Sequence, residues 1–427
     1  MKRLFALFLA CMMLFLTACN QTPPNETTSG NPQNQEQPKD SDLKDTIIKK
    51  GGENSLLDTP SRIVFSQLFA VGQYDDQYNF YYSKADGKAY VYCFDPLCDH
   101  SGEKCLARPM YYDMTRKIAG FELFSTVFIN NRFYGVAKQG QIYSFAFDGS
   151  DLRIEYGKDS YTNEEINELQ HYWDPNIRAC GSYIYIRLNA DENGNPHTLR
   201  FNTETKEMED LTEKTGNFIH PDFFFNEEIY GRGADRLWYK SDLELKETQS
   251  IEAMPTSSAF YGSLFFETAY DETDSKRNKA IGLQVLDMKT GEKTIISNEM
   301  LGLEAPTRYT IAAADENYIY FYPFKRILIG TFVDAKGREI KIYKDNEGKL
   351  YRVKHDGTEC ICIYDNPNFE FDYPEIGIIV GNQFVIKGQY YSLDDNGQPI
   401  GTGVTLKAGT IAPDGTIEKF EDVELIY

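Results

Sequence analysis

The sequence predicts an all-β body, a seven-bladed β-propeller, which follows a signal peptide and a disordered tether. Three observations predict it: a polar tract that ends near residue 55, an aromatic-rich remainder with almost no helical periodicity, and a strand-and-turn pattern that recurs along that remainder. The chain holds 30 Tyr and 28 Phe, and aromatic side chains favour strands.

The first 19 residues have the order of an export signal. Lys2 and Arg3 precede an apolar run over residues 4–16, which ends in Leu16-Thr17-Ala18-Cys19. The run of about 13 residues is shorter than the roughly 20 needed to span a bilayer. Its end resembles the lipobox of bacterial lipoproteins, in which the cysteine receives diacylglycerol and becomes the mature N-terminus. We therefore expect a signal peptide over residues 1–18 and lipidation of Cys19.

This signal and the charge of the chain limit the partners. Diacyl attachment provides stable anchoring, so the expected location is the extracytoplasmic face of the cell membrane. The chain has 44 basic and 65 acidic residues and a net charge of −21. A surface this acidic repels nucleic acid and anionic lipid headgroups. The expected partners are the membrane, through the diacylglycerol, and a protein, peptide or glycan ligand, with no nucleic acid.

The segment after Cys19 is a predicted linker. Residues 20–55 are rich in Asn, Gln, Pro, Thr and Ser and poor in apolar residues, so they cannot bury enough surface to offset the entropy of ordering. We expect residues 19–55 to be a lipidated, disordered spacer and residues 56–427 to be the propeller domain.

A repeat organises the body. Each expected copy starts with a polar turn and an aromatic strand, and continues with a second strand, a tight turn and a third strand. The first parts cover residues 77–82, 130–134, 181–185, 226–230, 261–266, 316–320 and 381–385, and the second turns lie at 86–87, 148–149, 202–205, 241–242, 289–291, 356–357 and 414–415. Asp-Gly between alternating strands is a strong hairpin signal.

The period predicts the blade count. Asp86 to Asp414 spans six intervals of about 55 residues each, and one four-stranded sheet per repeat is typical of a propeller. Six or eight blades remain open, and a pair of β-sandwiches is the alternative architecture. We expect insertions at residues 191–196 and 324–348, and ring closure between residues 61–66 and the strands near residues 416–425.

A cysteine and histidine cluster follows the first blade. Cys93, Cys98, His100 and Cys105 have the spacing C-x4-C-x-H-x4-C, and three thiolates with one imidazole can hold tetrahedral Zn²⁺. Such a site would be structural, because four protein ligands leave no open position. A disulfide among the cysteines is the alternative, since exported chains oxidise their thiols, and reduced thiols are the third.

The lipobox, the polar tether, the Tyr-rich blades and this cluster together resemble a group of β-propeller lipoproteins from Gram-positive anaerobes. That group carries a Cys…Pro-x-Cys-x-His…Cys segment in the first blade, matched here by Cys93, Pro96, Cys98, His100 and Cys105. The resemblance covers nearly the whole chain. It implies the fold and the location, and it brings no activity with it.

The other candidate sites have weaker patterns. Cys360 and Cys362 are two apart in a predicted strand and so share a face. Residues 191–195 alternate Asp and Asn but lack the Gly and Glu positions of a calcium loop. Residues 171–174 (His-Tyr-Trp-Asp) form an aromatic, polar cluster near a short predicted helix over residues 161–172.

The sequence favours a propeller that binds a ligand or partner with its loops and performs no chemistry, since no recognised catalytic motif occurs in it. The alternative is a carbohydrate-active or other hydrolytic propeller enzyme with a site at the channel mouth. A third hypothesis is a sensor or assembly factor at the cell wall. Propellers host both binding and catalysis.

Overall fold

The structure is a computed structural model in which the chain divides into two units, Met1–Lys39 and Asp40–Tyr427. It describes residues 56–58, 62–68, 78–94, 96–98, 100, 105, 126–136, 141–148, 150–157, 176–188, 197–211, 220–233, 235, 237–251, 259–271, 273, 279–333, 337–344, 346–366, 377–393 and 399–426. All of them belong to the second unit. The expected signal peptide, Cys19 and the tether lie outside these residues.

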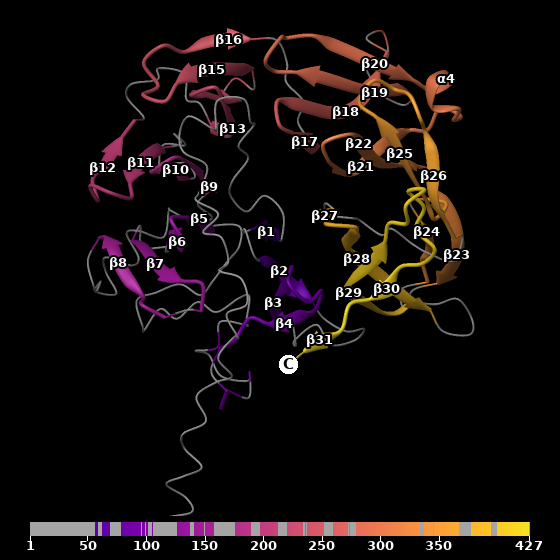
Figure 1. Cartoon of the computed structure of the whole chain (residues 1–427), viewed down its shortest axis with the longest axis horizontal. Helices are drawn as coiled ribbons and strands as arrows, with labels where there is room; N and C mark the ends of the chain where they lie inside the picture. The colour runs from indigo at the N-terminus through magenta and orange to yellow at the C-terminus, as the bar shows by residue number, and fades with distance from the viewer. Residues whose placement is uncertain are drawn as a thin grey trace, which may run out of the picture. The chain divides into compact units, whose positions relative to one another are not determined.

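Seven antiparallel blades of four strands each stand around a ring in the second unit (Figure 1). The last strand of the chain adds a parallel fifth strand to the first sheet, and a separate two-stranded sheet is inserted in the sixth blade. Blade 1 contains β1 (Leu56–Asp58), β2 (Arg62–Leu68), β3 (Tyr78–Ser83) and β4 (Ala89–Val91); blade 2 contains β5 (Thr126–Ile129), β6 (Arg132–Val136), β7 (Ile142–Ala146) and β8 (Arg153–Tyr156). Blade 3 contains β9 (Asn176–Cys180), β10 (Tyr183–Leu188), β11 (His197–Asn202) and β12 (Met208–Asp210); blade 4 contains β13 (His220–Phe225), β14 (Glu228–Arg232), β15 (Trp238–Asp242) and β16 (Gln249–Ile251).

The remaining blades have the same plan with additions. Blade 5 contains β17 (Ala259–Tyr261), β18 (Leu264–Tyr270), β19 (Ala280–Asp287) and β20 (Lys293–Ser297), followed by the one-turn helix α4 (Asn298–Leu301). Blade 6 contains β21 (Arg308–Ala314), β22 (Tyr318–Phe324), β25 (Lys349–Lys354) and β26 (Ile361–Asp365), with the hairpin of β23 (Ile327–Val333) and β24 (Glu339–Lys344) inserted between β22 and β25. Blade 7 contains β27 (Ile378–Val380), β28 (Gln383–Leu393), β29 (Pro399–Thr410) and β30 (Glu421–Asp422), and β31 (Leu425–Ile426) follows.

The seven-bladed propeller predicted from the repeat is therefore confirmed. Residues 324–348 hold the inserted hairpin, as expected. Residues 191–196 lie outside the described part of the chain, and so do residues 161–172 and 171–174.

The third and fourth strands of every blade are joined by a turn that begins with Asp or Asn. In each turn this side chain accepts a hydrogen bond from a backbone N–H a few residues further on. The residues are Asp86, Asp148, Asn202, Asp242, Asp287, Asp356 and Asp414. Short carboxylate and amide side chains mimic a backbone turn in this way, which is why the repeat was visible in the sequence.

Two expectations about blade 1 and the ring closure are wrong. Tyr78–Ser83 precedes the Asp86 turn directly and is the third strand of its blade, whereas the repeat assigned it to the first part of a copy. The closing strand β31 pairs with β4, in parallel, through Leu425 to Ala89 and Ile426 to Tyr90. Within the expected segment, Arg62, Ile63, Val64 and Phe65 pair with β3 inside blade 1 instead.

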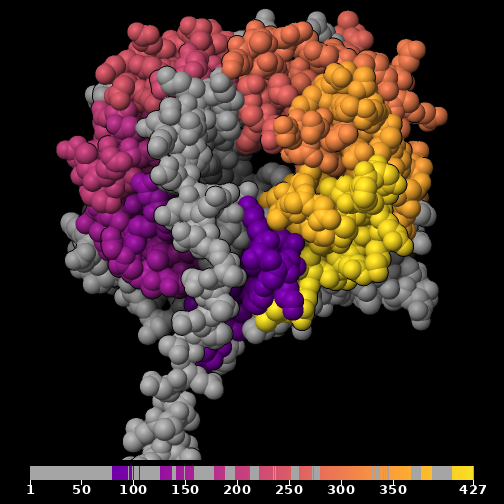
Figure 2. All heavy atoms as spheres, in the orientation of Figure 1, coloured from indigo at the N-terminus to yellow at the C-terminus, as the bar shows by residue number. Residues whose placement is uncertain are grey.

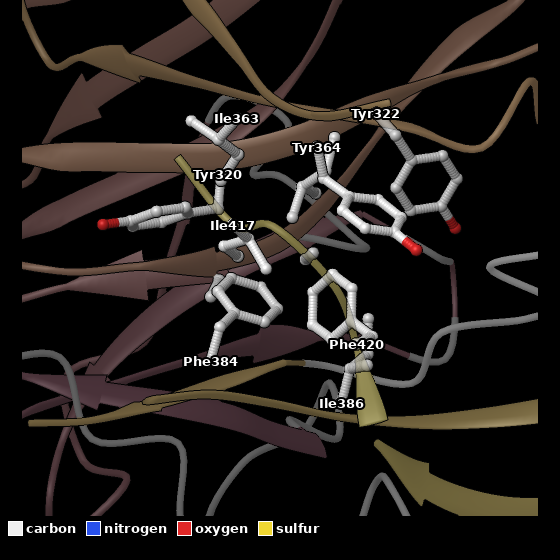
Figure 3. Packing of buried hydrophobic residues seen from close by; sticks show 11 residues of the cluster. Tyr320, Tyr322, Ile363, Tyr364, Phe384, Ile386, Ile417 and Phe420 are labelled. Atoms are coloured by element: carbon white, nitrogen blue, oxygen red, sulfur yellow. The ribbon is translucent and has the colours of Figure 1, made fainter. Parts of the chain in front are cut away.

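The core consists of apolar layers between adjacent blades. Between blades 6 and 7, Tyr320, Tyr322, Ile363 and Tyr364 face Phe384 and Ile386, while Ile417 and Phe420 pack into the same layer (Figure 3). The side chains in this layer are nearly excluded from water, and burial of such aromatic surface stabilises each junction by several kcal/mol.

Polar contacts recur at the same place in three junctions, where the turn after a third strand is held by the preceding blade. Tyr92 Oη donates to Phe147 O (2.5 Å), Tyr185 Oη donates to Leu243 O (2.8 Å), and an Arg352 nitrogen donates to Asp414 O (3.1 Å). These three carbonyls lie in the turns of blades 2, 4 and 7. These three pairs of blades are therefore held together by their turns.

Candidate metal centre

The candidate metal centre begins where β4 ends. Tyr92 N donates to Asn79 O (2.8 Å), and Cys93 N donates to Val91 O (2.7 Å), so the backbone turns sharply off the strand. The Tyr92 side chain is fully buried and reaches blade 2. Cys93 therefore directly follows a residue that is held by blade 1 through its backbone and by blade 2 through its side chain.

The structure brings all four predicted ligands together. The Sγ atoms of Cys93, Cys98 and Cys105 and a ring nitrogen of His100 all lie within 4.8 Å of one another. Cys105 Sγ lies 3.4 Å from His100 Nδ1, and His100 N donates to Cys98 Sγ at 3.4 Å. His100 has a φ of 58°, a left-handed conformation that is uncommon for residues other than glycine.

These distances fit zinc. With Zn–S bonds near 2.3 Å and Zn–N bonds near 2.1 Å, tetrahedral ligand atoms lie about 3.5–3.8 Å apart. The 3.4 Å from Cys105 Sγ to His100 Nδ1 agrees with this. A backbone N–H directed at a thiolate sulfur, as at Cys98, is the kind of outer contact that orients a metal ligand.

The centre is closed on its inner side. Cys105 is buried, and Cys93, Cys98 and His100 are half-buried. The sulfurs pack against the apolar cluster of blade 1 that contains Phe80. Four protein ligands complete a tetrahedral shell, so the arrangement suits a structural metal and leaves no position for a substrate.

The other cysteines lie elsewhere. Among the described residues, no cysteine takes part in a disulfide. Cys180 packs against a buried cluster of blades 3 and 4. Cys360 packs between blades 5 and 6, while Cys362 is exposed and its thiol donates to Tyr364 O. In the part of the chain that the structure describes, Cys93, Cys98, His100 and Cys105 are the one group found with metal-binding geometry.

The two ends of the ring differ in their connections. First and second strands are joined by tight turns such as Asn130-Asn131 and Gly262-Ser263, and third and fourth strands by the Asp or Asn turns. The longer connections, including residues 92–125 and the β23–β24 hairpin, all join strands at the opposite end, which we call the loop face. The metal centre belongs to the connection over residues 92–125. Figure 2 shows a hollow at the middle of the ring.

The cysteine spacing predicted the ligand set, but it gave no sign of the neighbours of the site. Val423 and Leu425 pack on the same apolar cluster as Cys105, Cys93 and Cys98. These C-terminal residues are far from the cysteines in sequence. Only the ring, which brings the last strand beside β4, places them together.

Fold and site together define a closed seven-bladed β-propeller with a Cys₃His cluster at the end of its first blade. No protein-family model matches the chain, and no curated protein matches it. Similar solved structures include an oligogalacturonate lyase in complex with manganese (TM-score 0.32, 14% identity, 56% of this chain and 61% of that chain). A post-proline cleaving enzyme from Rickettsia typhi has a TM-score of 0.39 and 10% identity, with 74% of this chain and 47% of that chain covered.

The computationally designed Ika8 protein is also similar, with a TM-score of 0.36, 11% identity and coverage of 84% of this chain and 96% of that chain. The chain covers less than two thirds of the length of the two enzymes. At such identities and TM-scores, the likenesses say nothing about activity. Among the described residues, no helix has the length and apolar character needed to span a membrane.

Proposed function

We propose that this protein is a lipid-anchored, extracytoplasmic propeller that binds a protein, peptide or glycan ligand at its loop face, and that Cys93, Cys98, His100 and Cys105 hold a structural Zn²⁺. The unequal ends of the ring carry the binding proposal. One end is made of short turns, while the other collects the long connections and the β23–β24 hairpin, and long loops on a rigid scaffold are where binding residues concentrate.

The anchor rests on Leu16-Thr17-Ala18-Cys19 and the preceding basic and apolar residues. Cells fed an alkyne-tagged fatty acid should label the wild-type chain and leave Cys19→Ala unlabelled and out of the membrane fraction. Cys180→Ala is the matched control, because this cysteine packs inside the body, and it should label as the wild type does. Equal labelling of both variants would contradict the anchor.

The binding role is tested by a screen of glycans and peptides against the full chain. A ligand of the loop face should lose affinity when a short Gly-Ser linker replaces residues 327–344, since this change removes the hairpin and keeps the four strands of blade 6. The connection over residues 157–175 is varied in the same way. If the affinity is unchanged in both sets of variants, the ligand does not bind at the loop face. Cleavage of a glycan or peptide during the screen would support the hydrolase alternative instead.

The zinc proposal rests on the 4.8 Å cluster and its fit to a tetrahedral ion. Elemental analysis of the purified full chain should find about one zinc per chain, and Cys98→Ser should reduce it strongly. Cys362→Ser is the control, because this exposed cysteine lies outside the cluster. A chain without zinc whose mass is two hydrogens lower would show the disulfide alternative.

A further inference from the structure

We propose that the metal centre and the C-terminal strand β31 form one device that closes the ring, so that metal binding and docking of β31 strengthen each other. The inference rests on the zinc site proposed above and adds a role to it. Its evidence is the geometry of the junction between blade 7 and blade 1.

The closing strand makes few contacts of its own. It pairs with β4 through Leu425 and Ile426 alone. Ala89 N donates to Glu424 O (3.2 Å), and Lys88 Nζ lies 3.1 Å from Glu424 Oε2. Both side chains of this ion pair are exposed, so the pair contributes little. A two-residue strand at a sheet edge needs further support to remain paired.

The cysteines can supply that support through a shared apolar cluster. This cluster contains Phe80, Tyr82 and Val91 from blade 1, together with Val385 and Leu406 from blade 7. Cys105 belongs to it, and Cys93 and Cys98 pack against it.

The C-terminal segment packs on the same cluster. Val423 is one of its buried members, and Leu425 packs against it beside the cysteines. Val423 N also donates to Leu406 O (2.9 Å), which fixes the segment to blade 7 just before β31 begins. The cysteine ligands and the closing strand therefore pack on the same apolar cluster.

This junction differs from the other six. Each of those joins blades that follow one another in sequence, and the junctions of blades 1 and 2, 3 and 4, and 6 and 7 are also held by a turn of the next blade. The closing junction joins the two ends of the domain, so the entropy lost in forming it is larger. A metal that holds Cys93, Cys98 and Cys105 at this cluster reduces the conformational freedom of the side to which β31 docks.

Coupling of this kind is reciprocal. Whatever free energy metal binding adds to docking of β31, docking must add to metal binding. Damage to β31 should therefore weaken zinc binding, although β31 supplies no ligand.

The first experiment measures zinc affinity of the full chain by competition with a chromophoric chelator. Leu425→Asp should weaken zinc binding by about five-fold or more, the lower range of coupling between sites. Leu328→Asp is the matched control, because Leu328 is 51% exposed on β23, and its affinity should equal that of the wild type. Equal affinity in all three chains would overturn the coupling.

The second experiment uses the wild-type chain, so it does not depend on the folding of a variant. Carboxypeptidase should remove residues from the C-terminus faster after zinc is chelated, and added zinc should restore protection. In Cys98→Ser, digestion should be fast with or without zinc. If the wild-type chain is digested at the same rate with and without zinc, the coupling is overturned while the zinc site stands. A chain that binds no zinc in either experiment would refute the site itself.

Discussion

At the scale of single residues, Arg200 links two blades through several polar contacts at once. It comes from β11 and its side chain is only 7% exposed. Its guanidinium lies 2.6 Å from Glu209 and 2.7 Å from Glu244, donates to Leu243 O (2.9 Å), and covers the Tyr183 ring at 4.7 Å. Because Glu244 and Leu243 belong to blade 4, this one side chain fastens blade 3 to the next turn.

Replacement of this residue should be costly. Arg200→Met keeps most of the apolar stem and should lower the free energy of unfolding by about 2 kcal/mol, the scale of hydrogen bonds to charged groups. Arg153→Met is the control: Arg153 also pairs with a carboxylate, but its side chain is 57% exposed, so water screens the pair and its loss should change the free energy of unfolding far less than the loss of Arg200. Equal costs in denaturant titrations would contradict the role of Arg200.

His355 links stability to pH. It lies in the turn before β26, its ring is 4.9 Å from that of Phe266 in blade 5, and burial lowers its pKa below the ordinary value. As the pH falls below about 6.5, His355 becomes protonated in the unfolded chain while it stays neutral in the folded chain. The free energy of unfolding therefore decreases. Asp315 and Asp356 act in the opposite direction without reversing the shift.

The His355→Phe variant tests this linkage. It keeps an aromatic ring against Phe266 and removes the titrating group. Between about pH 6.5 and pH 5, its free energy of unfolding should fall less steeply than that of the wild type. Parallel curves from denaturant titrations over this window would show that His355 does not contribute.

At the scale of elements, the Asp414 turn shows how closely blades approach each other. Gly415 has a φ of +86°, and a Cβ there would lie 1.9 Å from Arg352 Cζ. The Arg352 guanidinium is held between this turn and the Tyr318 ring, 4.3 Å from its centre. A side chain therefore fits at this position only if the Arg352 guanidinium moves away from the Tyr318 ring and from Asp414 O.

Gly415→Ala should lower the free energy of unfolding by roughly 2–3 kcal/mol, through backbone strain and displacement of Arg352. Gly291→Ala is the matched control. Gly291 lies in the corresponding turn of blade 5 with a φ of +73° and no atom within 4 Å of its Cβ position, so only the backbone strain of about 1 kcal/mol should appear. Calorimetry of both variants measures the difference. If the two substitutions lowered the free energy of unfolding equally, the packing argument would be contradicted.

The elements also show what could be predicted from the sequence. The Asp and Asn turns were visible because one short side chain shapes each turn locally. The four metal ligands were visible because they lie within one segment, residues 93–105. The order of strands in blade 1 was predicted wrongly, because the link between β1 and β2 has none of the Asn or Gly residues that mark the same turn at Asn130 or Gly381.

Contacts between blades could not be predicted. Arg200 and Glu244 are 44 residues apart, and nothing in the local pattern of either strand identifies the partner. The same holds for Leu425 and Ala89, which meet only because the ring closes. A repeat predicts that neighbouring blades pack against each other. Which side chains meet between two blades depends on how each blade is rotated about the ring axis, and the repeat does not give this rotation.

At the scale of the whole molecule, the stability of each blade depends on its neighbours, and this makes the C-terminus important. Successive blades pack on one another through apolar layers, and a repeat that contacts only its neighbours loses cooperativity when an end is released. Deletion of residues 424–427 removes β31 and its ion pair while Phe420 and Val423 remain in the core. The deleted chain should therefore melt at a temperature several degrees lower, or in two steps that start at blades 1 and 7.

A control of larger size makes this comparison specific to ring closure. A Gly-Ser linker in place of residues 327–344 removes many more residues, but the β23–β24 sheet is separate from the four strands of blade 6. Calorimetry should show a melting temperature close to that of the wild type for this variant and a lower one for the deletion. If the replacement of residues 327–344 lowered the melting temperature more than the deletion of residues 424–427, the four C-terminal residues would not close the ring. Their loss would then destabilise the protein less than the loss of the inserted hairpin.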